Sequence, residues 1–72
     1  MDAKIATDIS ARMIEICRQL DESAAVVRRS SPSDGSRYAI VIAEVFDIIN
    51  TKILEPLYYE HPHLAPPHWK DT

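Results

Sequence analysis

Three histidines lie close together near the end of the 72-residue chain: His61, His63 and His68. The His-x-His spacing of the first two can present two imidazoles to one Zn²⁺, Ni²⁺ or Cu²⁺ ion, and His68 or Glu60 can add a third ligand. The motif is weak because no cysteine pair or helical histidine pair accompanies it, and surface histidines in a proline-rich tail are the simpler interpretation. We therefore predict no resident cofactor and keep a weak metal site here as an alternative.

The same tail holds most of the aromatic side chains. Tyr58, Tyr59 and Trp69 are three of the five aromatic residues, and the stretch between Tyr59 and Trp69 contains three prolines. Proline-rich segments dock into aromatic grooves, and Tyr and Trp are favoured anchors at protein interfaces. We expect either an extended, polyproline-like tail over residues 61–72 that binds another protein, or a tail that lets Tyr58 and Trp69 fold back and cap the helical part.

Arg28, Arg29 and Arg37 form the one basic cluster of the sequence and flank a predicted loop. Such a cluster can bind a phosphate or an acidic partner, and it can equally cap a helix end and stay in solvent. The net charge of the chain is −3. Because a general nucleic-acid binder carries a basic face, this balance argues against nucleic acid, which we keep as an alternative partner for these arginines.

The residues that could carry catalysis form no familiar set. Glu44 and Asp47 lie one helical turn apart and could act together with copies from a second chain, but the Glu-x-x-His pattern of metal-binding bundles is missing. The simpler interpretation places them on a solvent-facing stripe. Cys17 has no histidine near it in the sequence, and we interpret it as a small buried side chain. We therefore predict that the chain is not an enzyme.

The first segment, residues 3–29, has the period of a helix. Its apolar residues follow one another at intervals of three or four: Ile5, Ile9, Met13, Ile16, Leu20, Ala24 and Val27. Asp2 can cap the start, and two arginines lie in the last turn, where cations suit the helix dipole. We predict one long helix that buries this apolar stripe.

A short loop follows. Residues 30–36 contain the only Gly, one of the five Pro and four Ser, a composition typical of a connection between periodic segments. Ser31, Pro32 and Asp34 also form a typical helix start, so the second helix begins at either residue 32 or residue 37. Because short connections make long helices antiparallel neighbours, both alternatives predict an all-α helical hairpin.

The second segment, up to residue 55, is apolar over most of its circumference. A strand is the competing interpretation, since the segment is rich in β-branched residues, but its polar residues recur at three and four and favour a helix. Pro56 is expected to stop or kink this helix near Leu54 or Glu55, with one short turn to residue 60. The hairpin then occupies residues 1–60 and the tail residues 61–72.

A helix this apolar must be buried on more than one side, which one partner helix cannot achieve. The chain is also too short to bury a large core, and its single Cys excludes an internal disulfide. We therefore predict a homo-oligomer, most simply a dimer that forms a four-helix bundle. The side chains expected in the interface are Tyr38, Ile42, Val45, Phe46, Ile49 and Ile53.

The remaining predictions concern location and role. The lone Cys fits a reducing compartment, the first residues lack the features of a signal peptide, and the longest apolar stretch is shorter than the ~20 residues of a membrane span. We predict a cytoplasmic protein without a membrane partner. Its expected function is a homo-oligomeric protein-interaction module, an adaptor or small regulator. The alternatives are a nucleic-acid-binding regulator and a bundle that binds a metal or small molecule.

Overall fold

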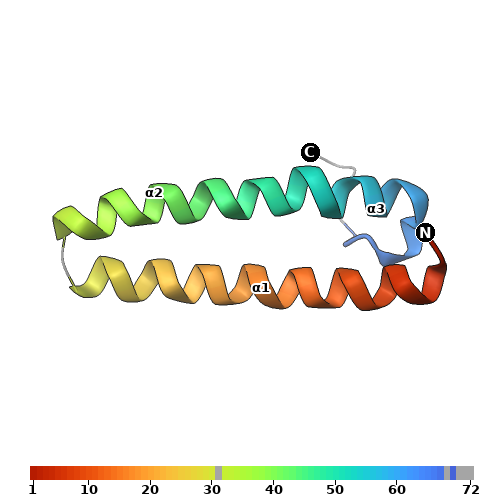
Figure 1. Ribbon diagram of the computed structural model, residues 1–72, viewed down its shortest axis with the longest axis horizontal. Coiled ribbons are helices and arrows are strands. Elements are labelled where there is room, and N and C mark those ends of the chain that lie inside the picture. Colours follow the sequence, from red (N-terminus) through yellow and green to blue (C-terminus); the bar gives the residue numbers. More distant parts are fainter. Residues whose placement is uncertain (31, 68, 70–72) are drawn as a thin grey trace.

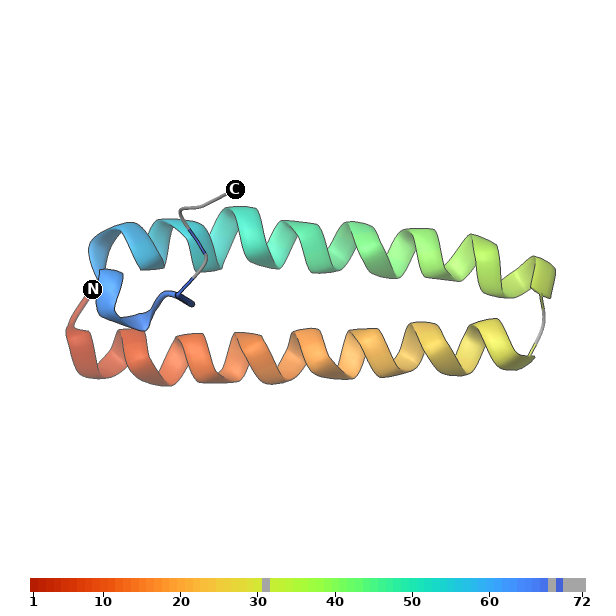
Figure 2. The same cartoon turned by 180° about the vertical axis from the view of Figure 1, so that it is seen from behind.

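A computed structural model of the chain describes residues 1–30, 32–67 and 69, which contain helices and turns but no strand. Two long helices, α1 (Ala3–Ser30) and α2 (Pro32–Ile48), lie side by side and run in opposite directions (Figure 1; Figure 2). α2 passes directly into a π-helical turn, η1 (Ile49–Leu54), and then into α3 (Glu55–Glu60). The prediction of an all-α helical hairpin is confirmed.

The connection between the long helices is the shorter of the two predicted. α1 ends at Ser30 and α2 begins at Pro32. The two helices approach closely there, because a Cβ atom added to Gly35 would lie 2.7 Å from the Cα atom of Arg28 and 2.9 Å from the carbonyl oxygen of Val27. The single glycine of the chain is therefore required by helix packing and does not belong to the loop.

α1 begins where the sequence predicts. The backbone N–H of Lys4 donates to Oδ1 of Asp2 at 2.7 Å, which satisfies one of the donors that a helix start leaves without a partner. Arg28 and Arg29 lie in the last turn. These local signals explain why the helix begins and ends at these residues.

The side of α1 that faces the core contains most of the predicted stripe. Ala24 is buried, and three further members are partly buried and pack against the core: Ile9, Met13 and Leu20. Two members differ, because Ile5 and Ile16 are exposed, and the next residue along the chain, Ala6 or Cys17, is buried instead. The small side chains at these two positions permit a closer approach of the helix axes than isoleucines would.

Pro56 does not end the helical path. The N–H of Glu55 donates to the carbonyl of Asn50, five residues back, and Pro56 lies in the first turn of α3. Proline has no N–H and clashes with the carbonyl four residues before it in a regular helix. The wider π turn relieves this conflict, so the chain stays helical to Glu60.

The described part of the tail turns back instead of extending. Pro62–Leu64 form a short 3₁₀ helix, η2, and the N–H of Trp69 donates to the carbonyl of Pro66 at 3.1 Å. Leu64, Ala65 and Trp69 pack against the buried core of the hairpin. The expected extended tail is therefore not found over residues 61–67, because burial of its apolar side chains favours the folded-back path. None of the described helices is long and apolar enough to cross a membrane.

Candidate interaction surface

The hairpin leaves much of its apolar surface uncovered. Across the described residues no large side chain is completely buried, and three of the eight buried hydrophobic residues are alanines. In the same part of the chain, thirteen large hydrophobic side chains are exposed. Monomeric soluble proteins rarely expose apolar side chains in a contiguous patch, so their arrangement decides whether they form a binding surface.

Four of these side chains form a stripe along α2. Tyr38, Val41, Val45 and Ile48 follow one another at steps of three and four, which places them on one side of the helix. Each is between 42% and 55% exposed. The stripe lies beside the line of contact with α1, where Ala39 and Ile49 are buried.

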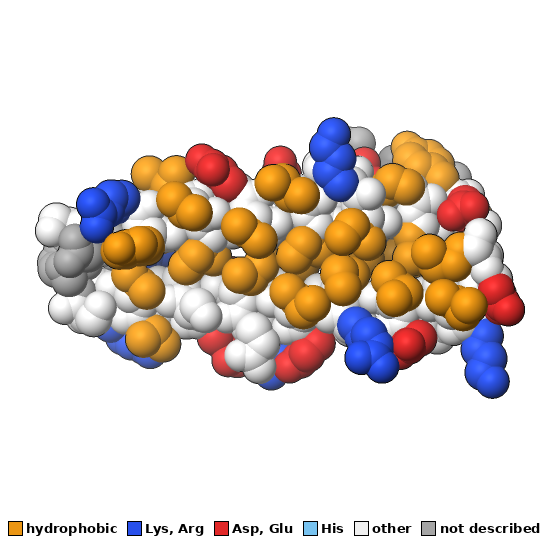
Figure 3. Space-filling view, viewed as in Figure 1, with side chains coloured by type: hydrophobic (Ala, Val, Ile, Leu, Met, Phe, Trp, Pro, Cys, Tyr) orange, Lys and Arg blue, Asp and Glu red, His pale blue; other side chains and the backbone are white. Residues whose placement is uncertain are grey.

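α1 contributes Ile5 and Ile16 to the same face. Each precedes a buried α1 residue, Ala6 or Cys17, by one position, just as the α2 stripe precedes the buried residues of that helix. In two antiparallel helices packed side by side, the same rotation away from the contact line leads to the same face of the pair. We call Ile5, Ile16, Tyr38, Val41, Val45 and Ile48 the front face. Figure 3 shows apolar side chains spread across both helices, with charged side chains along the edges.

The outer side of α2 is polar, as the sequence predicts. Glu44, Asp47 and Thr51 are all exposed, and the Thr51 hydroxyl donates to the carbonyl of Asp47 at 2.9 Å. Ile40 shares this side and is 62% exposed. It lies outside the front face, beside Ala43, and therefore provides a control position for the front face.

The six residues predicted to form an oligomer interface lie in four different places. Tyr38 and Val45 belong to the front face, and Ile53 is 37% exposed in the π turn. Ile42 and Ile49 pack between the helices of the hairpin, half-buried and buried respectively. Phe46 lines a pocket on the other side. The sequence reasoning missed Val41, Ile48 and the two α1 isoleucines, which the steps of three and four from Tyr38 and from Ile5 could have indicated.

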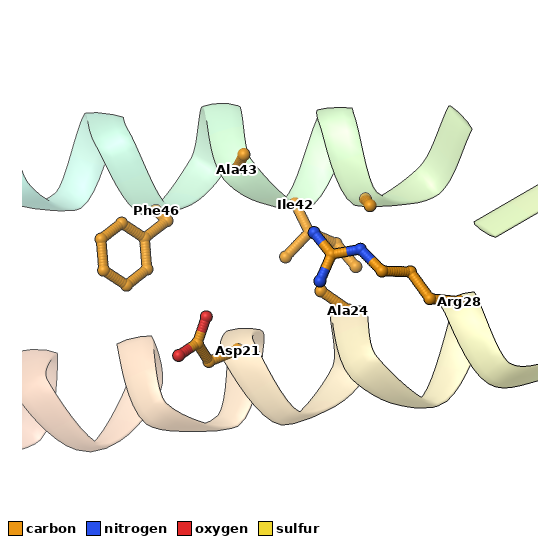
Figure 4. Close-up of a pocket in the computed structure, with 7 residues that line it drawn as sticks. Asp21, Ala24, Arg28, Ile42, Ala43 and Phe46 are labelled. Atoms are coloured by element: carbon orange, nitrogen blue, oxygen red, sulfur yellow. The ribbon is translucent and has the colours of Figure 1, made fainter. Parts of the chain in front are cut away.

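A pocket of about 140 Å³ opens on the back of the hairpin, opposite the front face (Figure 4). Its apolar wall is formed by Ala24, Ala39, Ile42, Ala43 and Phe46, and it is bounded by Asp21 and Arg28. The hollow exists because small alanine side chains meet where larger ones would fill the space between the helices. Neither charged residue forms an ion pair within the described chain.

Cys17 lies against the π turn. Nδ2 of Asn50 donates to the Phe46 carbonyl at 3.0 Å and lies 4.0 Å from Sγ of Cys17. Burial, and to a lesser degree the charge of Asp21, raises the pKa of the Cys17 thiol. Burial also raises the pKa of Tyr58, with a smaller contribution from Cys17. A raised thiol pKa disfavours the nucleophilic thiolate, which agrees with the interpretation of Cys17 as a small buried side chain.

The aromatic residues of the tail pack on one another. The ring of Trp69 meets Tyr58 and Tyr59 edge to face, with centroids 5.6 Å and 4.7 Å away. Tyr58 is 5% exposed, whereas Tyr59 is 69% exposed. Of the two predicted alternatives, the folded-back tail is the one that the structure contains, and Tyr59 remains at the surface.

The histidines do not assemble into a metal site within the described residues, where no group of three potential ligands is placed around a common point. The rings of His61 and His63 are perpendicular, with centroids 6.0 Å apart. Nε2 of His61 donates to the carbonyl of Met1 at 2.9 Å and helps attach the tail to the start of α1. The third predicted ligand, His68, lies outside the described residues.

The arginines are all close to the loop but have different surroundings. Arg28 borders the back pocket, Arg29 is exposed at the end of α1, and the guanidinium of Arg37 lies 4.9 Å from the centre of the Tyr38 ring. The last contact ties one arginine to the front face, because a cation over a tyrosine ring is attracted to it.

The chain matches no protein-family model, no curated protein and no solved structure.

Proposed function

We propose that the protein is a homo-oligomeric protein-interaction module, in which two hairpins pack front face against front face to form a four-helix bundle. The observation that carries this proposal is the front face itself. Its six apolar side chains are at least 42% exposed and come from both helices. Such a surface is costly in water and is covered at little cost by an identical copy.

The size of the face suits a stable dimer. Seen as in Figure 1, the hairpin is 43 Å long and 24 Å wide, so face-to-face contact offers on the order of 1,000 Å² per copy. A standard protein interface buries about 800 Å² per partner. The back pocket and the exposed Tyr59 stay outside this contact, which leaves a surface for the second partner that an adaptor needs.

The proposal is tested by two variants of α2 that each introduce one negative charge, on different sides of the helix. Val41→Glu puts a carboxylate in the middle of the front face, and Ile40→Glu puts it on the polar side, at a position that is even more exposed. In analytical ultracentrifugation the parent chain and Ile40→Glu should sediment as dimers, and Val41→Glu as a monomer. A monodisperse monomer for the parent chain, or equal behaviour of the two variants, would contradict the proposal.

A further inference from the structure

The buried residues of the second helix change their spacing across the π turn. The buried Ala39 and Ile49 and the half-buried Ile42 are spaced as in a regular helix. Steps of three and four from Ile49 would next reach Lys52 or Ile53. The next buried residue is instead Leu54, five positions on, followed by Leu57 and Tyr58. A step of five means that the turn contains one residue more than an α-helix would.

The hydrogen bonding shows the same extra residue. The N–H of Glu55 reaches the carbonyl five positions back, at Asn50. Because of the additional residue, every later side chain points in the direction that the residue before it would have in a regular helix, a difference of about 100° around the helix axis. Without it, Ile53, Pro56 and Leu57 would take the places of the buried Leu54, Leu57 and Tyr58. The π turn therefore decides which side chains are buried at this end, with Leu54 and Tyr58 inside and Ile53 and Pro56 outside.

The additional residue also changes which side chain follows Ile48 on the exposed stripe of α2. From Ile48, a regular helix would place Lys52 next along the stripe. The π turn puts Ile53 in that direction, since it directly precedes the buried Leu54 as Ile48 precedes Ile49. Ile53 is 37% exposed, and Lys52 is exposed beside it. An apolar residue thus continues the front face where a cation would otherwise interrupt it.

We infer that the π turn extends the self-association surface toward Pro56: Ile53 contacts the second copy, and Lys52 lies at the rim of the interface. This inference rests on the proposed dimer and adds a specific boundary to it. A second copy is the fitting occupant because Ile53 continues a stripe of four α2 residues that already needs an apolar partner of the same length. The charged Lys52 beside it then stays in solvent, which avoids the cost of burying an unpaired ammonium group.

The boundary is tested by charges at adjacent positions. Ile53→Glu should raise the dimer dissociation constant by at least about tenfold, as expected for an interface residue, whereas Lys52→Glu should change it by less than about threefold. Both variants should keep the Trp69 fluorescence of the parent chain, because neither side chain lies between the helices of one hairpin. An equal or larger effect of Lys52→Glu would overturn the inference.

The extra residue is tested by two deletions, each made together with Pro56→Ala so that no proline ring obstructs a regular turn. Removing Thr51 deletes the additional residue and leaves Ile53, Leu54 and Leu57 facing as before. Removing Glu44, another exposed polar residue of the same helix, rotates everything after it by about 100°. We expect the Thr51 deletion to keep the dimer and the Trp69 emission maximum, and the Glu44 deletion to lose the dimer and shift the emission toward that of solvated indole.

These measurements separate the two proposals. The Trp69 emission reports how α3 and the tail pack within one chain, so it tests the extra residue even in a monomer. Equal damage from both deletions would show that the turn carries no extra residue and would overturn the inference. A monomeric parent chain refutes the dimer and with it the role of Ile53. The Thr51 deletion then still tests whether the π turn contains the extra residue that separates the buried Ile49 and Leu54 by five positions.

Discussion

At the end of the hairpin that holds the tail, Leu54, Leu57 and Tyr58 are each at most 5% exposed, whereas the buried hydrophobic side chains nearest the loop are Ala24 and Ala39. The tail end has a third layer, because η2 and Trp69 cover the open side of the two helices. The loop end has two helices alone, a pocket between them and an exposed stripe along α2. One short chain therefore contains a core that it completes by itself and another that it leaves unfinished.

The difference shows how a small chain distributes its apolar residues. Large side chains are buried where three segments meet, since two helices in contact enclose little volume between them. Where two helices are alone, small residues permit close contact and the large ones point outward. The outward-pointing α2 residues of the loop half are among those that a second copy is expected to cover.

The largest expected effect is at the tail end. Leu57→Ala removes a 3% exposed side chain from the completed core and should lower the free energy of unfolding by about 3 kcal/mol. Ile42→Ala, the matched truncation of a half-buried residue in the loop half, should cost only about 1 kcal/mol. Urea unfolding at low protein concentration measures both. Equal losses would show that the two ends are packed alike.

The next effect concerns the close contact near the loop. Gly35→Ala places a methyl group 2.7 Å from the Cα atom of Arg28, and backbone atoms cannot move away cheaply. The steric cost should exceed the gain in helix propensity and leave a net loss of about 1–2 kcal/mol. Thermal unfolding provides the measurement, with Ser33→Ala, at an exposed position of the same helix, as control. A stabilised Gly35→Ala variant would show that the helices do not touch there.

A smaller effect of opposite sign follows from the pocket. Ala43→Leu extends an apolar side chain toward a hollow of about 140 Å³ and should raise stability by about 0.5–1 kcal/mol. Ala3→Leu makes the same change at an exposed position in the first turn of α1 and controls for helix propensity. The difference between the two variants in urea unfolding measures how incompletely the loop half is packed. No difference would mean that the pocket is too open to be filled usefully.

The sequence predicted the features of the fold that depend on local signals. The period of the apolar residues and the cap at Asp2 are each contained in a few neighbouring residues. So is the helix start at Pro32, which was one of the two starts that the sequence left open. Two positions of the α1 contact line were missed because hydrophobicity ranks Ile5 and Ile16 above Ala6 and Cys17, whereas close packing selects the small residues. The regular spacing of these small residues, together with the single Gly35, was the available signal.

The other differences arise from contacts between distant residues. Pro56 predicted a helix end or a kink because it breaks a regular helix. The wider turn that accommodates it was visible only as a step of five between Ile49 and Leu54. For the tail the sequence left two paths open, because its prolines favour an extended chain, whereas Tyr58 and Trp69 favour packing against the helices. The contact between these two rings decides for the folded-back path. For the candidate surface, the sequence predicted an excess of apolar residues on α2 but could not divide them between the inside of the hairpin and its front face.

The smallest expected effect on stability concerns an ion pair on the surface of α1, away from both cores. It gives a reference against which the effects of the core substitutions can be compared. On the outer surface of α1, Nε and Nη2 of Arg18 donate to the two carboxylate oxygens of Glu15 at 2.9 Å and 2.6 Å, and Nη1 donates to Glu22. The hydrogen bonds from Arg18, with a smaller one from Gln19, lower the pKa of Glu15 from 4.5 to about 2. Because the folded state favours the ionised carboxylate, the stabilisation is present above pH 4.5 and is lost as the pH falls toward 2.

Arg18→Gln should accordingly lower the thermal midpoint slightly near neutral pH, and the difference from the parent chain should vanish near pH 2 and shrink in high salt, since exposed ion pairs are screened. Arg29→Gln removes a charge from the same helix at a position that forms no ion pair within the described chain, so its effect should not vary over this pH range. A loss for Arg18→Gln that persisted in acid would assign the effect to side-chain packing. A loss as large as that of Leu57→Ala would mean that surface charge, and not the unequal cores, dominates the stability of this hairpin.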